Sequence, residues 1–402
     1  MTTTTQPPAA GSEGTTGSGS GAGVSGTPSS GSGGGSGGAL SGGSGSSGGG
    51  AGSSGSGSGG GARPLKEEQQ PASEAVTEVA PGVLRLQLPI QMPGLGHVNT
   101  YALVDDRGVA LMDPGLPGQA SWDALAQRLR SVGLATADVH TVFITHSHPD
   151  HFGLAPRLGR EARGRLEVIA HEAFAAGWRI ADGEELEVID IELDELPQAN
   201  PFGGETPWGQ PWERPPDAPD VEIEHPEPSR YVHDGDWLSL AGREMAVVYS
   251  PGHTLDHICL FDPTEGLLFA GDHVLPTITP HISGIGSGSD PLLRFEESLH
   301  KVGGMEGVRL VLPAHGGPFT DLRGRTEAIR DHHVGRLLRL RALSQDLGPA
   351  SVVELSHHLF REASWGGMAE SETYAHLEHL RLAGLAERRG EGQALVYALA
   401  AP

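Results

Sequence analysis

Hydrophobic and polar residues alternate along most of the chain after residue 82, first in strand-like and then in helix-like patterns. Strand-like runs lie at residues 82–88, 100–104, 109–112, 139–144 and 166–170. The turn sequence Asp105-Asp-Arg-Gly108 joins two of them and predicts a β-hairpin. Apolar residues with helical spacing lie at 120–132 and 153–162. Strands and helices therefore alternate, which predicts a layered α/β domain.

The same alternation returns in the second half of the chain. Strand-like runs lie at residues 237–240, 244–249, 257–261, 267–270 and 308–312, and helical patterns at 291–302 and 323–344. The last segment has a different order, with helical patterns at 351–360 and 371–383 followed by a hairpin pattern at 386–399. Helix, helix and hairpin in this order predict a winged helix-turn-helix over residues 336–402.

Two stretches depart from this pattern in composition. Residues 1–62 are almost entirely Gly, Ser, Ala and Thr, so we expect a disordered tail over residues 1–74. Residues 182–227 hold 15 acidic residues, one basic residue and eight prolines. Like charge and proline disfavour compact structure, which predicts a long surface insertion over 182–230. Both a lid over the site and an excursion away from it remain open. The layered domain is then expected over residues 75–335.

Charge and cysteine content narrow the class of protein. The net charge of −24 argues against general binding to nucleic acid or to anionic membranes. The single cysteine, Cys259, excludes an intrachain disulfide framework and is expected to pack as a small apolar residue. No apolar run reaches the roughly 18 residues that a membrane span needs, and the N-terminus has no signal-peptide pattern. We therefore expect a cytoplasmic protein.

A cluster of histidines follows the strand at 139–144 directly. It reads Thr145-His146-Ser-His148-Pro-Asp150-His151. Neutral imidazole and carboxylate are the nitrogen and oxygen ligands that zinc prefers. Because a loop at a strand end can direct its side chains to two places, we expect His146 and His148 to bind one ion and Asp150 and His151 to bind a second.

Three further strands also end in a metal-ligand type of residue. These residues are His253, Asp272 and His315. Each is weak evidence alone, because a polar residue at a strand end is commonly a turn residue. Together with the cluster they complete two coordination spheres. Asp113 is a fifth carboxylate at a strand end and is expected to orient a ligand histidine.

These motifs resemble those of the metallo-β-lactamase-fold hydrolases, whose hallmark is H-x-H-x-D-H followed by His, Asp and His. The resemblance covers roughly residues 75–335. It implies an α+β fold, a four-layer αββα sandwich with the metals at one edge between two mixed sheets. It also implies the ligands of two zinc ions. The first would be bound by His146, His148 and His253 and the second by Asp150, His151 and His315, and Asp272 would bridge them.

The segment Pro251-Gly-His253-Thr-Leu-Asp-His257 and the C-terminal extension are similar to the β-lactamase-like-protein-2 branch of this superfamily. The segment Gly96-His-Val-Asn99-Thr100 and the pair His332-His333 fit the same branch. The resemblance favours zinc, because di-iron members have glutamate at the position of His148. The donor set accepts iron or manganese as well.

The resemblance implies a metal-dependent hydrolase. If the acidic insertion is a lid, its carboxylates would repel a polyphosphate chain, which favours a small acyl substrate, such as a thioester, ester or lactone, as in glyoxalase-II-like members. A water activated by two zinc ions is then the nucleophile, and Asp150 accepts its proton. His281 and Asn99 are candidates for substrate contacts, with loop hydrogen bonds as the alternative. The remaining histidines, His376 and His379 among them, are expected to be surface or helix residues.

Two other functions remain open at this point. The same branch includes ribonucleases, and Arg381, Arg388 and Arg389 offer phosphate contacts, which makes a metal-dependent endoribonuclease the alternative. Acidic residues such as Glu378 interleave with these arginines and indicate an ordinary solvated face instead. A DNA-binding regulator is the third hypothesis, but residues 371–383 lack the basic character that it needs. Packing, homodimerisation or a place at the pocket edge suit the C-terminal segment better.

Overall fold

The structure, a computed structural model, describes residues 65–92, 94–174, 205–211 and 223–402. All of these belong to one compact unit. Most of the predicted tail, residues 1–64, lies outside the described residues. Of the acidic insertion predicted over 182–230, residues 182–204 and 212–222 also lie outside them.

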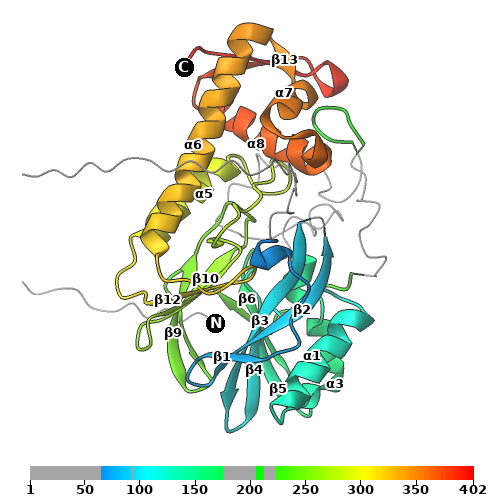
Figure 1. Cartoon of the computed structure of the whole chain (residues 1–402), viewed down its shortest axis with the longest axis vertical. Helices are drawn as coiled ribbons and strands as arrows, with labels where there is room; N and C mark the ends of the chain where they lie inside the picture. The colour runs from blue at the N-terminus through cyan, green and yellow to red at the C-terminus, as the bar shows by residue number, and fades with distance from the viewer. Residues whose placement is uncertain (1–64, 93, 175–204, 212–222) are drawn as a thin grey trace, which may run out of the picture. The chain divides into compact units, whose positions relative to one another are not determined.

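Two mixed sheets form the centre of the fold (Figure 1). The first sheet has seven strands: β1 (Thr77–Ala80), β2 (Val83–Met92), β3 (Leu95–Asp105), β4 (Gly108–Met112), β5 (Val139–Phe143), β6 (Glu167–His171) and β7 (Arg230–Val232). Their order in the sheet is their order in the chain. Neighbouring strands are antiparallel from β1 to β4 and parallel from β4 to β7. The second has the order β12-β11-β10-β9-β8, with one parallel pair, β11–β12; its strands are β8 (Trp237–Leu240), β9 (Arg243–Tyr249), β10 (Ile258–Asp262), β11 (Leu267–Gly271) and β12 (Leu310–Pro313).

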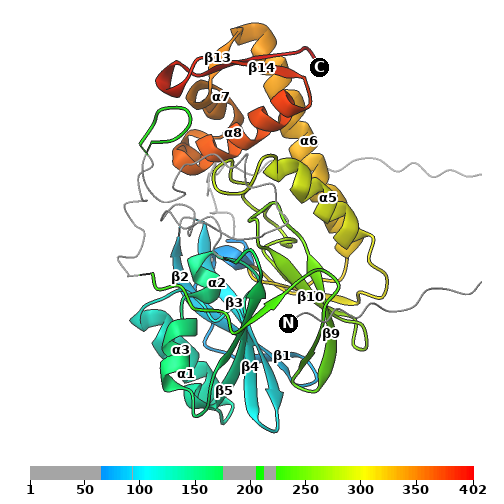
Figure 2. The ribbon, with the colours of Figure 1, turned by 180° about the vertical axis from the view of Figure 1, so that it is seen from behind.

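Helices cover the outer face of each sheet (Figure 2). The first sheet carries α1 (Gln119–Ser131), α2 (Pro149–Phe152) and α3 (Ala155–Glu161), and the second carries α5 (Pro291–Gly303) and α6 (Leu322–Leu347). One apolar core lies under α1 and α3, one lies between the sheets, and one lies under α5 and α6. Three cores between four layers form the αββα arrangement, which confirms the predicted fold class.

The predicted helix over 153–162 corresponds to α3, which begins at Ala155, and α2 precedes it as a separate turn over Pro149–Phe152. The backbone amide of Leu154 donates to the carbonyl of Gly115 at 3.2 Å instead of to its own helix. Pro156 lies in the first turn of α3, where its missing amide costs no hydrogen bond. The break leaves α2 as a single turn that carries Asp150 and His151.

Helix α6 runs without a break through residue 335, where the sequence predicted a domain boundary. After it come β13 (Ala350–Ser351), α7 (Val352–Leu359), α8 (Gly367–Leu382), β14 (Ala386–Arg389) and β15 (Val396–Leu399). The three strands form a small sheet in the order β13-β15-β14. These elements bury a fourth core, which includes Leu355, Leu377 and Tyr397. The order of helices and hairpin is the predicted one, and the winged-helix interpretation stays a prediction.

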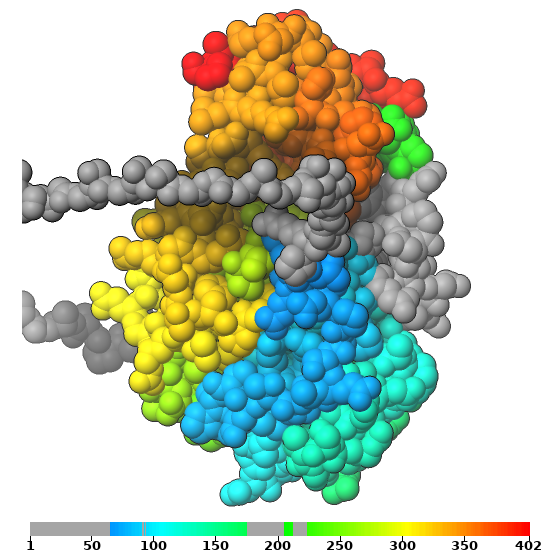
Figure 3. Space-filling model, in the orientation of Figure 1, coloured from blue at the N-terminus to red at the C-terminus, as the bar shows by residue number. Residues whose placement is uncertain are grey.

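Residues 65–74, predicted to belong to the tail, are part of the described structure. Glu68 lies in a short 3-10 helix (Glu67–Gln69) and is buried, and Glu67 pairs with Arg85 of β2 at 2.7 Å. Figure 3 shows the blue N-terminal residues lying directly against the yellow segment that follows β12. Composition alone could not predict these contacts, because the partners are distant in sequence.

None of the helices in the described ranges combines the length and the apolar character needed to cross a membrane.

Candidate metal centre

The seven predicted ligands lie in loops or turns that follow strands, and the structure brings them together. His146 and His148 come soon after β5 ends, and α2 presents Asp150 and His151 in its only turn. His253 follows β9, Asp272 follows β11 directly, and His315 lies two residues after β12. Gly271, with a φ of 49°, allows the close approach at the end of β11, because a Cβ there would lie 2.7 Å from the Nε2 atom of His257.

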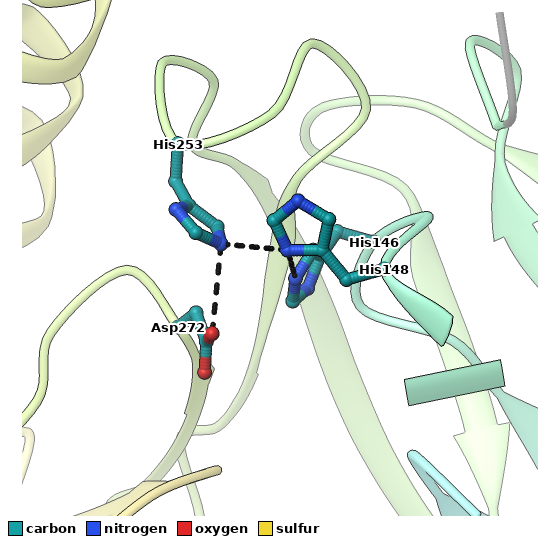
Figure 4. A group of neighbouring side chains, drawn as sticks. All are labelled: His146, His148, His253 and Asp272. Carbon is teal, nitrogen blue, oxygen red and sulfur yellow. Dashed lines mark hydrogen bonds and ion pairs between the residues drawn. The ribbon is translucent and has the colours of Figure 1, made fainter. Parts of the chain in front are cut away.

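His146, His148, His253 and Asp272 form the first group, with ligand atoms within 4.8 Å of one another (Figure 4). The Nδ1 atom of His148 lies 2.9 Å from Nε2 of His146 and 3.1 Å from Nε2 of His253. An Oδ2 atom of Asp272 lies 3.5 Å from Nε2 of His253. Three ring nitrogens and a carboxylate oxygen therefore face one point.

Asp150, His151 and His315 form a second group beside the first. The Nε2 atoms of His151 and His315 lie 3.5 and 3.4 Å from Oδ2 of Asp150. Asp272 faces this group too, with Oδ1 at 3.5 Å from His315 and Oδ2 at 3.7 Å from His151. Asp272 is therefore placed where a bridging carboxylate would lie.

Four of the five histidines are oriented by a hydrogen bond that their Nδ1–H donates away from the site. The acceptors are Thr145 Oγ1 for His146 at 3.0 Å, Asp113 Oδ2 for His151 at 2.9 Å, the His281 carbonyl for His253 at 2.7 Å and the His97 carbonyl for His315 at 2.9 Å. A ring that donates from Nδ1 keeps a lone pair on Nε2 when it is neutral. All four Nε2 atoms thus face the site as metal-binding imidazoles do.

Asp113 organises two of these contacts. Its carboxylate accepts from the backbone amide of Thr145 at 2.9 Å, from the Thr145 hydroxyl at 2.8 Å and from the ring of His151. Because the Thr145 hydroxyl donates to Asp113, its oxygen is free to accept from His146. Asp113 has a φ of 53°, a conformation that aspartate tolerates better than most residues.

The donor set fits divalent cations. The Nε2 atoms of His151 and His315 and Oδ1 of Asp272 are buried and have no hydrogen-bond partner among the described residues. Ligand atoms about 2.0–2.2 Å from a tetrahedral zinc ion lie roughly 3.3–3.6 Å apart. The nitrogen–oxygen separations of 3.4–3.7 Å are close to this range and too long for hydrogen bonds.

The two groups differ in charge. Burial and the neighbouring ring of His253 lower the pKa of His148 to about 3. Burial acts to lower the pKa of His315 as well, but Asp272 and Asp150 raise it to about 10. A cation at the second group would therefore replace a proton on His315, as metal binding commonly does.

The predicted substrate contacts make other contacts within the protein. The side-chain amide of Asn99 donates to the carbonyls of Pro313 and Gly316 at 2.8 Å each, and its oxygen accepts from Arg85. These bonds hold the loop that carries His315, which favours a positioning role for Asn99. The ring of His281 faces Glu372 of α8 at 3.5 Å. Contact of either residue with a substrate stays a prediction.

The sequence did not predict two of the orienting contacts. The carbonyls of His97 and His281 hold metal-centre histidines, and a backbone carbonyl leaves no trace in residue type. The spacing of Glu372 and His376 could have predicted that these two side chains are neighbours, because residues four apart lie on one face of a helix.

Known proteins of one superfamily are similar to this chain in sequence and fold. The sequence profile of the metallo-beta-lactamase superfamily matches residues 93–331. A crystal structure of a metallo-beta-lactamase family protein from Thermus thermophilus is similar, with a TM-score of 0.61, 31% identity, and coverage of 80% of this chain and 100% of that one.

Curated relatives carry hydrolase names. The atrochrysone carboxyl ACP thioesterase of Aspergillus fumigatus is 26% identical over 61% of this chain and 56% of its own length. The probable metallo-hydrolase YqjP of Bacillus subtilis is 24% identical over 74% of this chain and 92% of its own length. The chain spans 48% and 56% of the length of two of the fungal relatives.

Proposed function

Because this chain belongs to the metallo-β-lactamase superfamily, we propose that it is a metal-dependent hydrolase of small acyl substrates, such as thioesters, esters or lactones. The observation that carries the proposal is the convergence of seven side chains of metal-ligand type. Four of the five imidazoles among them are oriented by a hydrogen bond that Nδ1–H donates away from the site. The name of the fungal relative, an acyl-carrier-protein thioesterase, supports the substrate class.

The chain's own residues would hold two zinc ions. His146, His148 and His253 would bind one, Asp150, His151 and His315 the other, and Asp272 would face both. When bound, such ions supply an activated water and an electrophilic contact for a carbonyl oxygen. Iron or manganese would fit the same donor set.

The surrounding residues define the acid–base properties of the centre. Burial acts to raise the pKa of Asp150, but His151 and His315 lower it well below its usual value. Asp150 is therefore ionised at neutral pH, as a metal-binding carboxylate must be. Its role as proton acceptor for the attacking water stays a prediction. Asp113 keeps the rings of His151 and, through Thr145, of His146 in one orientation.

The endoribonuclease alternative gains no support from the C-terminal arginines. Within the described residues, Arg381 pairs with Glu378 at 2.9 Å and Arg388 with the same carboxylate at 3.7 Å. Arg389 pairs with Glu387 at 2.8 Å. Arginines that are already neutralised offer a poor surface for phosphates. The predicted homodimer, cytoplasmic location and DNA-binding role stay predictions.

A thiol-release assay on acyl thioesters tests the proposal. The zinc-loaded chain should release thiol, a chelator should abolish release, and added zinc should restore it. Cleavage of single-stranded RNA at a higher kcat/KM than that of every thioester, ester and lactone would replace the proposal with the endoribonuclease.

A further inference from the structure

A short loop connects the metal centre to the C-terminal helices. It comprises residues 281–285, and Figures 1 and 2 show the yellow-green chain after β11 passing beneath α8. Its first residue, His281, accepts the Nδ1–H of His253 on its carbonyl at 2.7 Å. The position of this carbonyl decides whether Nε2 of His253 faces His148 and Asp272. The loop therefore fixes one ligand of the first group.

Helix α8 holds the loop through backbone and side-chain contacts. The amide of Gly284 lies 3.3 Å from both the carbonyl and the hydroxyl of Ser371, and the hydroxyls of Ser283 and Ser371 are 3.0 Å apart. A Cβ at Gly284 would lie 2.6 Å from Cδ1 of Tyr374, so only glycine fits between the loop and the helix. The side chain of Ile285 is buried in the core of the C-terminal elements. Both ends of this short loop are therefore tied to α8.

Glu372 adds a charged contact at the start of the loop. Its Oε2 atom lies 3.5 Å from Nδ1 of His281, and Oε1 is paired with Arg336 of α6. Arg336 in turn lies over the ring of Phe360, 4.3 Å from its centre. Burial acts to raise the pKa of Glu372, but the bond to His281 and the charge of Arg336 lower it to about 2. The carboxylate is therefore ionised and held in place from two sides.

The same carboxylate belongs to a third buried group of metal-ligand type, with His333 and His376. The ring of His376 donates from Nδ1 to the backbone carbonyl of Glu372 at 2.7 Å and accepts on Nε2 from Nδ1 of His333 at 3.1 Å. Both carboxylate oxygens of Glu372 are engaged as described above. Of the ligand-type atoms in this group, only Nε2 of His333 lacks a partner among the described residues, which favours a rigid anchor over a third metal site.

We propose that α8 positions one ligand of the metal centre. Its contacts hold the loop at residues 281–285, and this loop fixes the ring of His253 and thereby sets the metal affinity of the first group. Ser371 and Glu372 are positioning residues in this arrangement. The inference rests on the proposed metal site and adds a specific consequence. A disturbance at α8 weakens one of the two cation sites and leaves the group of Asp150, His151 and His315 unchanged.

Zinc titration of the full chain against a chromogenic chelator tests this, because it resolves two affinities without an activity assay. Ser371 and Glu372 act on His253 only through the loop, so Ser371→Ala and Glu372→Gln should each weaken one site by about 10-fold, the lower end of the effect of losing a direct contact to a metal-binding histidine, and leave the other within twofold. Gly284→Ala should act in the same direction by displacing the loop. Glu370→Gln is the matched control on α8, because Glu370 bonds Trp208 and not the loop; it should change neither affinity.

Two unchanged affinities in all three variants would overturn the inference. So would an equal loss at both sites, because that result describes general destabilisation. A thermal melt of the zinc-free variants shows that the titrated protein is folded, and Ser371→Ala, which removes only one hydroxyl, keeps the test available if Gly284→Ala does not fold. A wild-type chain that binds two zinc ions but cleaves no acyl substrate would refute the proposed function and leave the α8 inference standing. A wild-type chain that binds no zinc would overturn both.

Discussion

Two buried clusters of histidine and carboxylate lie in this protein, and they differ in how their polar atoms are paired. In the metal centre, three buried atoms of His151, Asp272 and His315 have no hydrogen-bond partner in the described part of the chain. The second, here called the α6–α8 cluster, comprises His281, His333, Arg336, Glu372 and His376. In it the carboxylate contacts both Arg336 and His281, and both ring nitrogens of His376 are bonded. One atom, Nε2 of His333, has no hydrogen-bond partner among the described residues.

This difference separates a binding site from a structural network of the same composition. Buried polar atoms without partners cost free energy, so several that converge on one point indicate a ligand that satisfies them. In the α6–α8 cluster the paired atoms hold their neighbours in place. Residue type alone does not distinguish the two clusters; the unpaired buried atoms of His151, Asp272 and His315 do.

The largest expected effect is on activity, from His148→Ala. Loss of this ligand should lower kcat/KM for a thioester by more than about 100-fold, because the loss of an outer-shell partner alone reaches that range. The ring of His148 lies within hydrogen-bond distance of His146 and His253, so the unfolding free energy of the zinc-free protein should fall by no more than about 1–2 kcal/mol. Kinetic assays and denaturant unfolding in chelator measure the two quantities.

His300→Ala is the control for this variant, because His300 is exposed on α5 and remote from the metal centre. It should change neither quantity. If zinc-free His148→Ala lost several kcal/mol, the metal centre would be a self-sufficient network like the α6–α8 cluster, and the comparison between them would fail.

Asp113→Asn should have the next largest effect. The carboxylate receives three donors from Thr145 and His151, and an amide would turn an NH₂ group toward one of them. We expect zinc affinity at the second group to fall by roughly 10- to 100-fold. Competition with a chelator gives the affinity, and Asp123→Asn on the exposed face of α1 serves as the control. Equal affinities in the two variants would mean that the ring of His151 is oriented by packing alone.

Local patterns in the sequence predicted most of the metal centre. The ligands from His146 to His151 lie within six residues, and the others follow apolar strands whose ends meet at one edge of the sheets. The layered α/β arrangement followed from the alternation of strand and helix patterns, and the four-layer αββα form followed from the family resemblance. Asp113 was also recognisable, because it ends a strand in the same way.

The contacts of α8 could not be predicted, because they join ordinary residues far apart in the chain. Ser371 and Gly284 carry no motif, and their pairing depends on how two layers of the fold meet. His376 lies on a helix as expected, yet it is fully buried, because His333 offers it a partner that sequence spacing does not reveal. Side chains that are satisfied by distant partners look like solvated ones until the fold is known.

The α6–α8 cluster predicts an acid dependence of stability. The pKa of Glu372 is lowered from 4.5 to about 2, so its contribution is fully present above pH 4.5 and is lost as the pH falls toward 2. Glu372→Gln should remove this slope, on the order of 3 kcal/mol between the two limits. Denaturant unfolding in chelator at several pH values measures it, and Glu370→Gln should retain the wild-type slope. Parallel curves for wild type and Glu372→Gln would show that the pairing with Arg336 and His281 does not persist in solution.

The smallest expected effect comes from the pair His379–Asp290, which ties α8 to the first turn of α5. The Nδ1 atom of His379 lies 3.1 Å from Oδ2 of Asp290, whose Oδ1 atom also caps α5 by accepting from the amide of Leu293. The bond to Asp290 raises the pKa of His379 above 6.5. The stabilisation is therefore fully present below pH 6.5 and is lost as the pH rises through the raised value. His379→Gln should lower the free energy of unfolding by less than about 1 kcal/mol at pH 5.5 and by close to nothing at pH 8.5.

An equal loss of unfolding free energy at both pH values would mean that a neutral hydrogen bond, rather than an ion pair, joins the two helices. His300→Gln, on the exposed side of α5, should show no cost at either pH.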